Sequence, residues 1–298
     1  MGTPDFAVPA LEALISSQYN VVAVITAPDK PAGRGLKIQT SPVKDVAIAH
    51  QIPVLQPTNL KDPIFIEELK SFGANLQIVV AFRMLPETVW NMPEIGTFNL
   101  HASLLPQYRG AAPINWAIIN GEKETGCTTF FLKQEIDTGD ILFSEKETIS
   151  EEDTFEELYN RLKLKGAGLV LKTVKAIESE HYTPAPQDYS SALKSAPKIH
   201  KETCKINWNQ SALEIKNFVR GLSPYPAAWT EINGKFCKIF KTSIISHDLS
   251  DTPAAISSDH KTYIHFTCGK GKLSVEELQI EGKKRMHVEE FLRGNKIV

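Results

Sequence analysis

The sequence predicts an α/β fold: a doubly wound domain with a mostly parallel sheet, followed by a small β-barrel domain. Over the first half of the chain, apolar runs of strand length alternate with amphipathic segments of helical period, which is the pattern of a doubly wound sheet. Beyond residue 200, short β-prone runs are separated by glycine turns. Strands of this kind are typical of a small barrel, here of the oligonucleotide-binding type.

The first half contains three apolar runs that lack polar alternation, and we expect them to form strands buried on both faces of a parallel sheet. They are residues 20–26, 76–82 and 128–132. Helices are expected between these runs at residues 42–50, 63–72 and 112–120, and after them at residues 154–180. The last helix follows an acidic segment with a serine, which favours a helix N-terminus.

Residues 181–200 break this periodicity with proline clusters and paired serines, so this stretch is expected to contain an interdomain linker. The predicted organisation is a first domain at residues 1–182, a linker at 183–200 and a barrel domain at 201–298. In the second domain we expect a helix at residues 211–222. Strands are expected at residues 228–232, 237–245, 263–267 and 273–280.

Composition narrows the class of protein. With 298 residues, of which 42% are hydrophobic and 23% charged, the chain has the composition of an ordinary globular protein large enough for two domains. No apolar run approaches the ~20 residues that span a bilayer, and the first residues lack the features of a signal peptide. Four widely spaced cysteines predict reduced, mostly buried thiols in a cytoplasmic protein.

The net charge of −2 is unevenly distributed. Residues 201–298 hold 15 Lys and Arg against 11 Asp and Glu, which leaves 18 basic and 24 acidic residues in the rest of the chain. A basic second domain beside an acidic first domain could help to hold a polyanion. A solvated surface explains the imbalance nearly as well.

Three polar residues carry the strongest functional signal. Asn99 and His101 lie two apart near the end of a strand-like stretch, so their side chains point to one face. An amide donor beside an imidazole suits acyl chemistry, in which a carbonyl oxygen gains negative charge. A carboxylate could orient the imidazole or relay a proton, and Asp137 and Asp140 of a later loop are both candidates. The alternative is that a polar strand end simply enters a turn.

Two nearby segments are candidates for binding a flat ligand. Residues 82–85 follow an apolar strand, at the strand end where open α/β sheets bind ligands. Residues 103–106 form a turn whose backbone can hydrogen-bond a heterocycle while its leucines pack against it, unless they only lead out of the strand. The residues concerned are Phe82, Arg83, Met84 and Leu85, and Ser103, Leu104, Leu105 and Pro106.

Two basic clusters are candidates for nucleic-acid contacts. The first lies in a glycine-rich loop, and a flexible basic loop can reach phosphates and bases. The second, in the predicted barrel, would present three charges to a phosphate backbone. Solvated surface turns are the alternative for both. The residues are Lys30, Arg34 and Lys37 in the loop, and Lys283, Lys284 and Arg285 in the barrel domain.

Six motifs stand in a defined order along nearly the whole chain. They are GTPDFA at residues 2–7, DKPAGRG at 29–35, NLHASLLPQYRGAAPI at 99–114, DTGD at 137–140, RGLSPYPAAW at 220–229 and GKKRM at 282–286. Together they resemble the methionyl-tRNA formyltransferase family. The resemblance implies a Rossmann-like formyltransferase domain followed by a C-terminal barrel that helps to hold tRNA.

The resemblance also implies a reaction. A formyl group would move from 10-formyltetrahydrofolate to the α-amine of methionine on initiator tRNA, in a cytoplasmic enzyme that we expect to be a monomer. The family pattern assigns catalysis to Asn99, His101 and Asp137, the folate contact to residues 103–106, and the contact with the tRNA acceptor end to residues 29–37. No metal is expected, because the formyl donor is already an activated N-acyl compound.

This reaction gives the three catalytic residues expected roles. Asn99 and His101 would donate hydrogen bonds to the formyl oxygen. Asp137 would pair with His101 or take the proton from the amine, which requires Asp137 to lie within a water's reach of His101. Cys127 is an alternative nucleophile, but it begins an apolar strand, whereas reactive thiols need electropositive, partly exposed surroundings.

One departure from the family pattern concerns the beginning of the chain. Family members usually have a strand directly before the segment that starts here at Gly2. That strand would be central in the sheet, and without it two strand edges inside the core would lack a partner. We therefore expect an incomplete sheet next to Gly2, with the native start upstream or the chain shortened.

Two other functions remain alternatives. A related folate-dependent enzyme would act on a small amine, such as a nucleotide sugar or a glycinamide, with the same catalytic triplet. The basic loop and the barrel domain favour tRNA over such a substrate. A folate- or RNA-binding protein without catalysis would have no need of aligned donors and a carboxylate.

Overall fold

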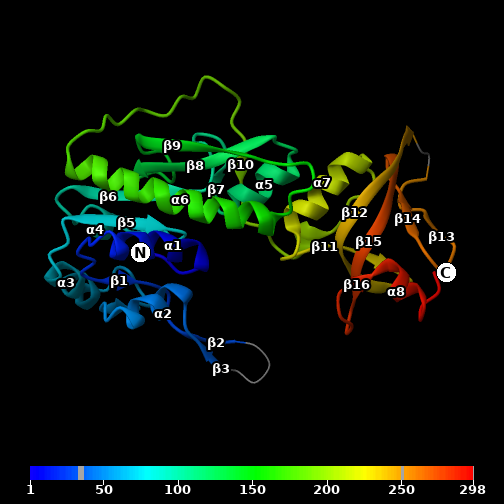
Figure 1. Cartoon of the computed structure of the whole chain (residues 1–298), viewed down its shortest axis with the longest axis horizontal. Helices are drawn as coiled ribbons and strands as arrows, with labels where there is room; N and C mark the ends of the chain where they lie inside the picture. The colour runs from blue at the N-terminus through cyan, green and yellow to red at the C-terminus, as the bar shows by residue number, and fades with distance from the viewer. Residues whose placement is uncertain (33–36, 250–251, 298) are drawn as a thin grey trace. The chain divides into compact units, whose positions relative to one another are not determined.

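The computed structural model describes residues 1–32, 37–249 and 252–297 of the chain (Figure 1). The chain forms two compact units that interleave along the sequence. The first comprises Met1–Arg109, Thr125–Glu147 and Tyr159–Lys194, and the second Gly110–Glu124, Thr148–Leu158 and Ser195–Val298. Because each unit combines segments from several parts of the chain, the domain boundaries expected at residues 182 and 200 stay a prediction.

The main sheet of the first unit has four strands in the order β5-β6-β8-β9. β5 and β6 run parallel, whereas β8 runs antiparallel to β6. The apolar run expected in a parallel strand at residues 128–132 therefore lies in an antiparallel one. Six consecutive buried residues in β8 hide the polar alternation that would have marked it. The bounds are Leu76–Val80 for β5, Gly96–His101 for β6, Glu124–Phe131 for β8 and Ile141–Thr148 for β9.

A separate two-stranded sheet pairs β1 (Val24–Ile25) in parallel with β4 (Val54–Leu55). The strand expected at residues 20–26 is thus reduced to two paired residues. Residues 20–23 instead line a cavity, where they have no neighbouring strand to extend the hydrogen-bonded ladder.

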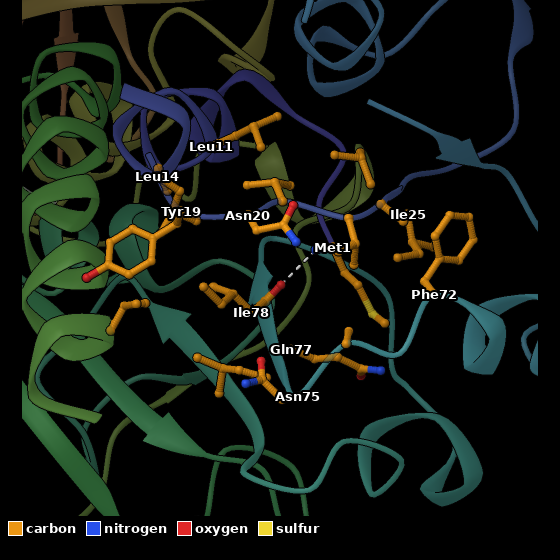
Figure 2. Close-up of a pocket in the computed structure, with 18 of the residues that line it drawn as sticks. Met1, Leu11, Leu14, Tyr19, Asn20, Ile25, Phe72, Asn75, Gln77 and Ile78 are labelled. Atoms are coloured by element: carbon orange, nitrogen blue, oxygen red, sulfur yellow. Dashed lines mark hydrogen bonds between the residues drawn. The ribbon is translucent and has the colours of Figure 1, made fainter. Parts of the chain in front are cut away.

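The first two residues of the chain lie between β1 and β5. The Gly2 N–H donates to the Ile25 carbonyl at 3.0 Å, and the Val80 N–H donates to the Met1 carbonyl at 2.9 Å. The Met1 amino group donates to the Ile78 carbonyl at 2.7 Å (Figure 2). Met1 and Gly2 therefore occupy one short stretch of the space between the two strands.

Next to them lies a cavity of about 770 Å³. Its walls include Leu11 and Leu14 of a helix, residues 20–25 and residues 73–78 (Figure 2). Among the described residues, β1 and β5 belong to separate sheets, and residues of both strands line this cavity. Burial lowers the pKa of the Met1 amino group to about 5, because desolvation disfavours its charged form.

Helices α2, α3, α5 and α6 confirm the four helices predicted in the first 180 residues. Ser41 caps α2 and Asp62 caps α3, each by accepting a backbone N–H of the first turn. Helices α1 and α4 are not among those predicted; α4 has only four residues, too few for a periodic signal, whereas α1 is as long as α3. The helices are η1 (Asp5–Ala7), α1 (Val8–Ser16), α2 (Pro42–Ala49), α3 (Pro63–Ser71), α4 (Glu87–Trp90), α5 (Pro113–Ile119) and α6 (Phe155–Glu178).

The long helix α6 approaches the main sheet closely at Gly166. A Cβ atom at Gly166 would lie 2.7 Å from a methyl carbon of Leu100 in β6, so a larger residue would force the Leu100 side chain or the helix to shift. Leu158, Leu162 and Leu169 of α6 are fully buried. This packing fixes the strand that carries Asn99 and His101.

The second unit is built on a six-stranded sheet in the order β11-β12-β15-β14-β13, with β16 beside β15. The four strands expected beyond residue 200 are confirmed as β11, β12, β14 and β15, and all the strand pairs of this sheet are antiparallel. Register shifts between β12 and β15 mark β-bulges, which bend and twist a sheet. The strands are β11 (Ala228–Ile232), β12 (Lys235–Leu249), β13 (Ile256–Ser258), β14 (Ile264–Thr267), β15 (Lys270–Ile280) and β16 (Met286–His287).

The predicted helix at residues 211–222 is α7 (Ala212–Leu222). It begins at a capping box, in which Ser211 accepts the Glu214 N–H and the Glu214 carboxylate accepts the Ser211 N–H. The other elements are α8 (Val288–Leu292), η2 (Glu202–Cys204) and the two-residue strands β7 (Arg109–Gly110) and β10 (Ser195–Ala196).

The four cysteines are all buried and unpaired, which confirms the expectation of buried free thiols. Burial raises the pKa of the Cys127 thiol to about 12, which disfavours the thiolate that a nucleophile needs. In the described parts of the chain, no helix combines the length and the apolar character needed to cross a membrane.

Candidate active site

Strand β6 places Asn99 and His101 near its carboxyl end. The strand lies between β5 and β8, with Asn99 opposite Val79 on one side and His101 opposite Thr128 on the other. Because the two residues are separated by one position, they share a face of the sheet. The strand predicted to carry Asn99 and His101 is therefore present, and it is hydrogen-bonded to a neighbouring strand on each side.

Both ring nitrogens of His101 face acceptors of the protein. Nε2 lies 2.8 Å from the Tyr108 carbonyl oxygen, and because a carbonyl oxygen only accepts, Nε2 carries a proton. Nδ1 lies 3.8 Å from Oδ2 of Asp137. The expected donation from His101 to a formyl oxygen is not available in this orientation, because its Nε2–H bonds the Tyr108 carbonyl and its Nδ1 faces Asp137.

Asp137 lies in the loop between β8 and β9, with a left-handed backbone φ of 55°. Its side chain is 11% exposed, against 7% for His101, so the pair is largely screened from water. The other candidate carboxylate, Asp140, forms an ion pair with Lys133 at 2.9 Å instead. The structure thus brings Asp137 to His101, and the separation of 3.8 Å lies within a water's reach.

Asn99 is half-buried. Among the described residues, no hydrogen-bond partner contacts its side-chain carboxamide. Its NH2 group is therefore available to an oxygen atom of a ligand, beside the His101–Asp137 pair. Of Asn99 and His101, the two donors expected for the formyl oxygen, Asn99 is the one whose side chain is available.

Several hydrogen bonds, which the sequence alone does not indicate, attach the turn at residues 103–106 to neighbouring residues. The Ser103 hydroxyl donates to the Gln107 carbonyl at 2.6 Å. Thr128 donates to the Ser103 carbonyl at 2.7 Å and accepts the Leu105 N–H at 3.2 Å. Ser103 and Leu105 are buried, whereas Leu104 and Pro106 are half-buried, so these latter two are the members of the turn that a ligand can reach.

The segment at residues 82–85 follows β5, at the same sheet edge as the end of β6. Leu85 is buried in a hydrophobic cluster against which Phe82 packs. Arg83 donates to the carbonyls of Pro57 and Thr58, and its guanidinium lies 5.8 Å from the Phe82 ring. Met84 points outward, with 72% of its surface exposed. The four residues therefore do not form one lining: Met84 is free for a ligand, and Leu85 belongs to the core.

The described residues at the two ends of the basic loop form a β-ribbon, in which β2 (Lys30–Ala32) pairs antiparallel with β3 (Lys37–Gln39). Lys30 is exposed, and Arg34 lies outside the described residues. At the base of the ribbon, Lys44 donates to Asp29 at 2.5 Å. This ammonium group holds the pKa of the Asp29 carboxyl below its usual range.

The second basic cluster follows β15. Lys283 and Lys284 are exposed. Arg285 is engaged by Glu277, with its Nε 2.6 Å from a carboxylate oxygen, and its guanidinium lies 4.6 Å from the Phe240 ring. Its charge is therefore partly neutralised, so the cluster offers two free lysines where the sequence suggested three cations.

Sequence reasoning missed the residues that surround the His101–Asp137 pair. The Tyr108 carbonyl contacts His101, and the Gln187 side chain donates to the Asp137 carbonyl. A backbone carbonyl leaves no signal in a sequence, and Gln187 lies in a stretch without periodicity. In the described parts of the chain, no group of three or more His, Cys, Asp or Glu side chains could hold a metal ion.

Two family models match the chain: the formyl transferase model at residues 1–174 and the formyl transferase C-terminal domain model at residues 198–296. A methionyl-tRNA formyltransferase of Bacteroides fragilis is 53% identical over 302 residues, which cover 99% of this chain and 93% of that protein. A methionyl-tRNA formyltransferase of Phocaeicola vulgatus is 54% identical over 306 residues, with coverage of 99% and 94%.

A solved structure with the same fold is the N-formyltransferase from Helicobacter canadensis in complex with folinic acid and dTDP-3-aminofucose. It covers 92% of this chain and 96% of its own, with a TM-score of 0.66 and 23% identity. At this identity the likeness shows the fold alone. The family models and the relatives of more than 50% identity together show that the chain belongs to the formyl transferase family, and within it to the methionyl-tRNA formyltransferases.

Proposed function

We propose that the chain transfers a formyl group from 10-formyltetrahydrofolate to the α-amine of methionine on initiator tRNA. The observation that carries this proposal is an unpartnered Asn99 carboxamide beside the buried His101–Asp137 pair, in a chain of this family. Acyl transfer to an amine requires a hydrogen-bond donor to the carbonyl oxygen and a group that accepts the proton of the amine, and these residues supply both.

Asn99 would donate its NH2 group to the formyl oxygen as negative charge develops there. Asp137, which Nδ1 of His101 faces, would take the proton that the attacking amine loses, and N10 of the folate would accept a proton as its bond to the formyl carbon breaks. An α-amino group has a pKa of roughly 7.7–8.0, so a modest acceptor suffices. The Tyr108 carbonyl would keep the His101 ring in place during this transfer, because it holds Nε2 at 2.8 Å.

A folate co-substrate would supply the formyl group on N10, and the residues expected to bind it offer suitable contacts. The open Asn99 amide suits the formyl oxygen, and the reachable Leu104, Pro106 and Met84 side chains offer apolar contacts to a flat ring. These apolar side chains would be supported by Phe82, Arg83 and Leu85, whose own contacts lie within the fold.

The tRNA contacts belong to the same proposal. Lys30 on the ribbon is exposed, as are Lys283 and Lys284 after β15, and such cations bind phosphates. Arg34 and Lys37 complete the proposed loop contact, and Arg285 would contribute less because Glu277 holds it. We further propose that the enzyme acts as a monomer in the cytoplasm.

The test mixes the purified chain with 10-formyltetrahydrofolate and methionine-charged initiator tRNA. Folate absorbance follows the transfer, and formylmethionine is recovered after deacylation. The proposal predicts formylmethionine in step with the folate change. Turnover with an amino-sugar nucleotide and none with the charged tRNA would favour a small-amine enzyme, and folate binding without turnover of either amine would favour a binding protein.

A further inference from the structure

Residues 187–194, which the sequence places in a linker, bond to the loop that carries Asp137 and to Gln107 and Tyr108, which follow the strand that carries His101. We call this segment the strap. It lies within the first compact unit, and it has two points of attachment. One leads to the backbone beside Asp137, and the other leads to the backbone beside His101.

The first attachment is made by the side chain of Gln187, a buried residue with 5% of its surface exposed. Its Nε2 donates to the Asp137 carbonyl at 2.8 Å and to the Gly139 carbonyl at 2.9 Å. Its Oε1 accepts from Arg109, which fixes which end of the amide faces the loop. Arg109 also donates to the Tyr189 hydroxyl at 2.8 Å.

The second attachment joins the strap to Gln107 and Tyr108. The Tyr108 N–H donates to the Lys194 carbonyl at 2.7 Å. The Gln107 side chain accepts the Lys194 N–H at 2.9 Å and donates to the Ala192 carbonyl at 3.1 Å. Tyr108 then presents its own carbonyl to Nε2 of His101 at 2.8 Å, so two hydrogen bonds separate the strap from the imidazole.

Both anchored loops hold a residue in the left-handed backbone region. The φ angle is 55° at Asp137 and 60° at Tyr108. A bulky residue such as tyrosine rarely adopts this conformation, and such conformations persist only where the surroundings enforce them. The strap supplies hydrogen bonds to the backbone of each, which accounts for their persistence.

We propose that the strap positions the catalytic pair, with Gln187 holding Asp137 and Gln107 holding His101 through Tyr108. The proposal rests on the proposed function, since it concerns the groups that would move the proton. Gln187 and Gln107 are positioning residues: neither needs to touch a substrate. A small displacement of either loop would change the 3.8 Å separation of His101 and Asp137.

The kinetic test uses Gln187→Glu. This variant keeps an acceptor for Arg109 but loses the two N–H donors that hold the Asp137 and Gly139 carbonyls. We expect kcat to fall by about 10–100-fold, since a misplacement of 1 Å can cost about 10²-fold, while KM for each substrate stays near its original value. Ser190→Ala is the matched control, because the Ser190 hydroxyl bonds only within the strap, to Asp188.

A second measurement needs no substrate. The ¹⁵N chemical shifts of the His101 ring, identified by their loss in His101→Asn, report which nitrogen carries the proton. We expect an Nε2–H form in the original chain, and a mixture of forms in Gln107→Leu, which removes the side-chain hydrogen bonds from Gln107 to the strap and so weakens the strap's hold on Tyr108. Thermal unfolding of each variant shows whether it is folded.

The two measurements separate the possible outcomes. A folded Gln187→Glu with unchanged kcat, or Gln107→Leu with an unchanged Nε2–H form, overturns the proposal. A fall in kcat that Ser190→Ala shares, or that comes with an equal rise in KM, also overturns it, because general damage would produce both. If the original chain forms no formylmethionine, the proposed function fails, and the ring shifts still decide whether the strap positions His101.

Discussion

The orientation of a single imidazole assigns the roles in the proposed active site. Nε2 of His101 is bonded to the Tyr108 carbonyl and Nδ1 faces Asp137. The proposed role of the ring is therefore to assist proton transfer with Asp137, and not to donate a hydrogen bond to the formyl oxygen. The Asn99 carboxamide remains as the donor for that oxygen. This division of labour differs from the one that residue types alone suggested.

Replacing Asn99 tests this division. Asn99→Ala removes the proposed donor, and the loss of one such donor typically lowers kcat by about 10²–10³. We expect the KM for folate to change little, because the donor acts on developing charge. Steady-state kinetics with both substrates measure this effect. Asn99→Asp keeps the shape and replaces the donor by an acceptor, so an active Asn99→Asp enzyme would contradict the assigned role.

The sequence predicts the site residues only where a regular structure places them. The two-residue spacing of Asn99 and His101 predicts a shared face because a strand alternates. The same reasoning does not separate Asp137 from Asp140, since the left-handed turn at Asp137 decides which carboxylate faces the imidazole. The Tyr108 carbonyl has no side-chain signature at all.

At the scale of elements, periodicity predicts the long helices and most strands. The helix at residues 154–180 is predicted because it repeats an apolar face over 24 residues. The segment at residues 187–194 is interpreted as a linker because its hydrogen bonds run to distant loops and leave no period. The antiparallel direction of β8 is missed for a related reason: burial on both faces makes it similar to a parallel strand.

The β2–β3 ribbon carries the prediction about tRNA. Lys30→Ala removes an exposed cation from the ribbon, so we expect KM for charged tRNA to rise while KM for folate is unchanged. The difference should shrink as salt is added, because phosphate contacts release counterions. Lys61→Ala, an exposed lysine outside the ribbon, is the control. Equal effects on both substrates would contradict an exclusive role in tRNA binding.

At the scale of the whole molecule, the buried Met1 amino group should make stability depend on pH. Its pKa is about 5 in the folded chain, against 8.0 for an ordinary amino terminus, so between these values the unfolded chain binds more protons. Stability contributed by this group therefore rises with pH from about 5 to 8, at roughly 1 kcal/mol per pH unit. Urea unfolding at several pH values measures this slope.

Acetylation of the Met1 amino group provides the control for that experiment. It removes the titration while leaving the chain otherwise unchanged. The slope between pH 5 and 8 should then decrease. An identical slope in the acetylated and free chains would show that the amino group is not responsible.

The cavity beside Met1 predicts a second effect on stability. Five valine and isoleucine residues added before Met1 would span about 17 Å as a strand and could pair with the free edges next to β1 and β5. We expect a higher melting temperature, because the extension buries apolar surface and moves the charged amine outward. A glycine–serine extension of equal length is the control. Equal melting temperatures for the two extensions would contradict this interpretation of the cavity.

The central claim is that the His101–Asp137 pair moves the proton during formyl transfer, and single-turnover formylation of methionyl-tRNA by Asp137→Asn tests it most directly. We predict a rate about 10²–10⁴-fold lower with both substrates still bound, and a rate close to the original for Asp140→Asn, whose carboxylate pairs with Lys133. An Asp137→Asn enzyme that transfers formyl at the original rate would contradict the account.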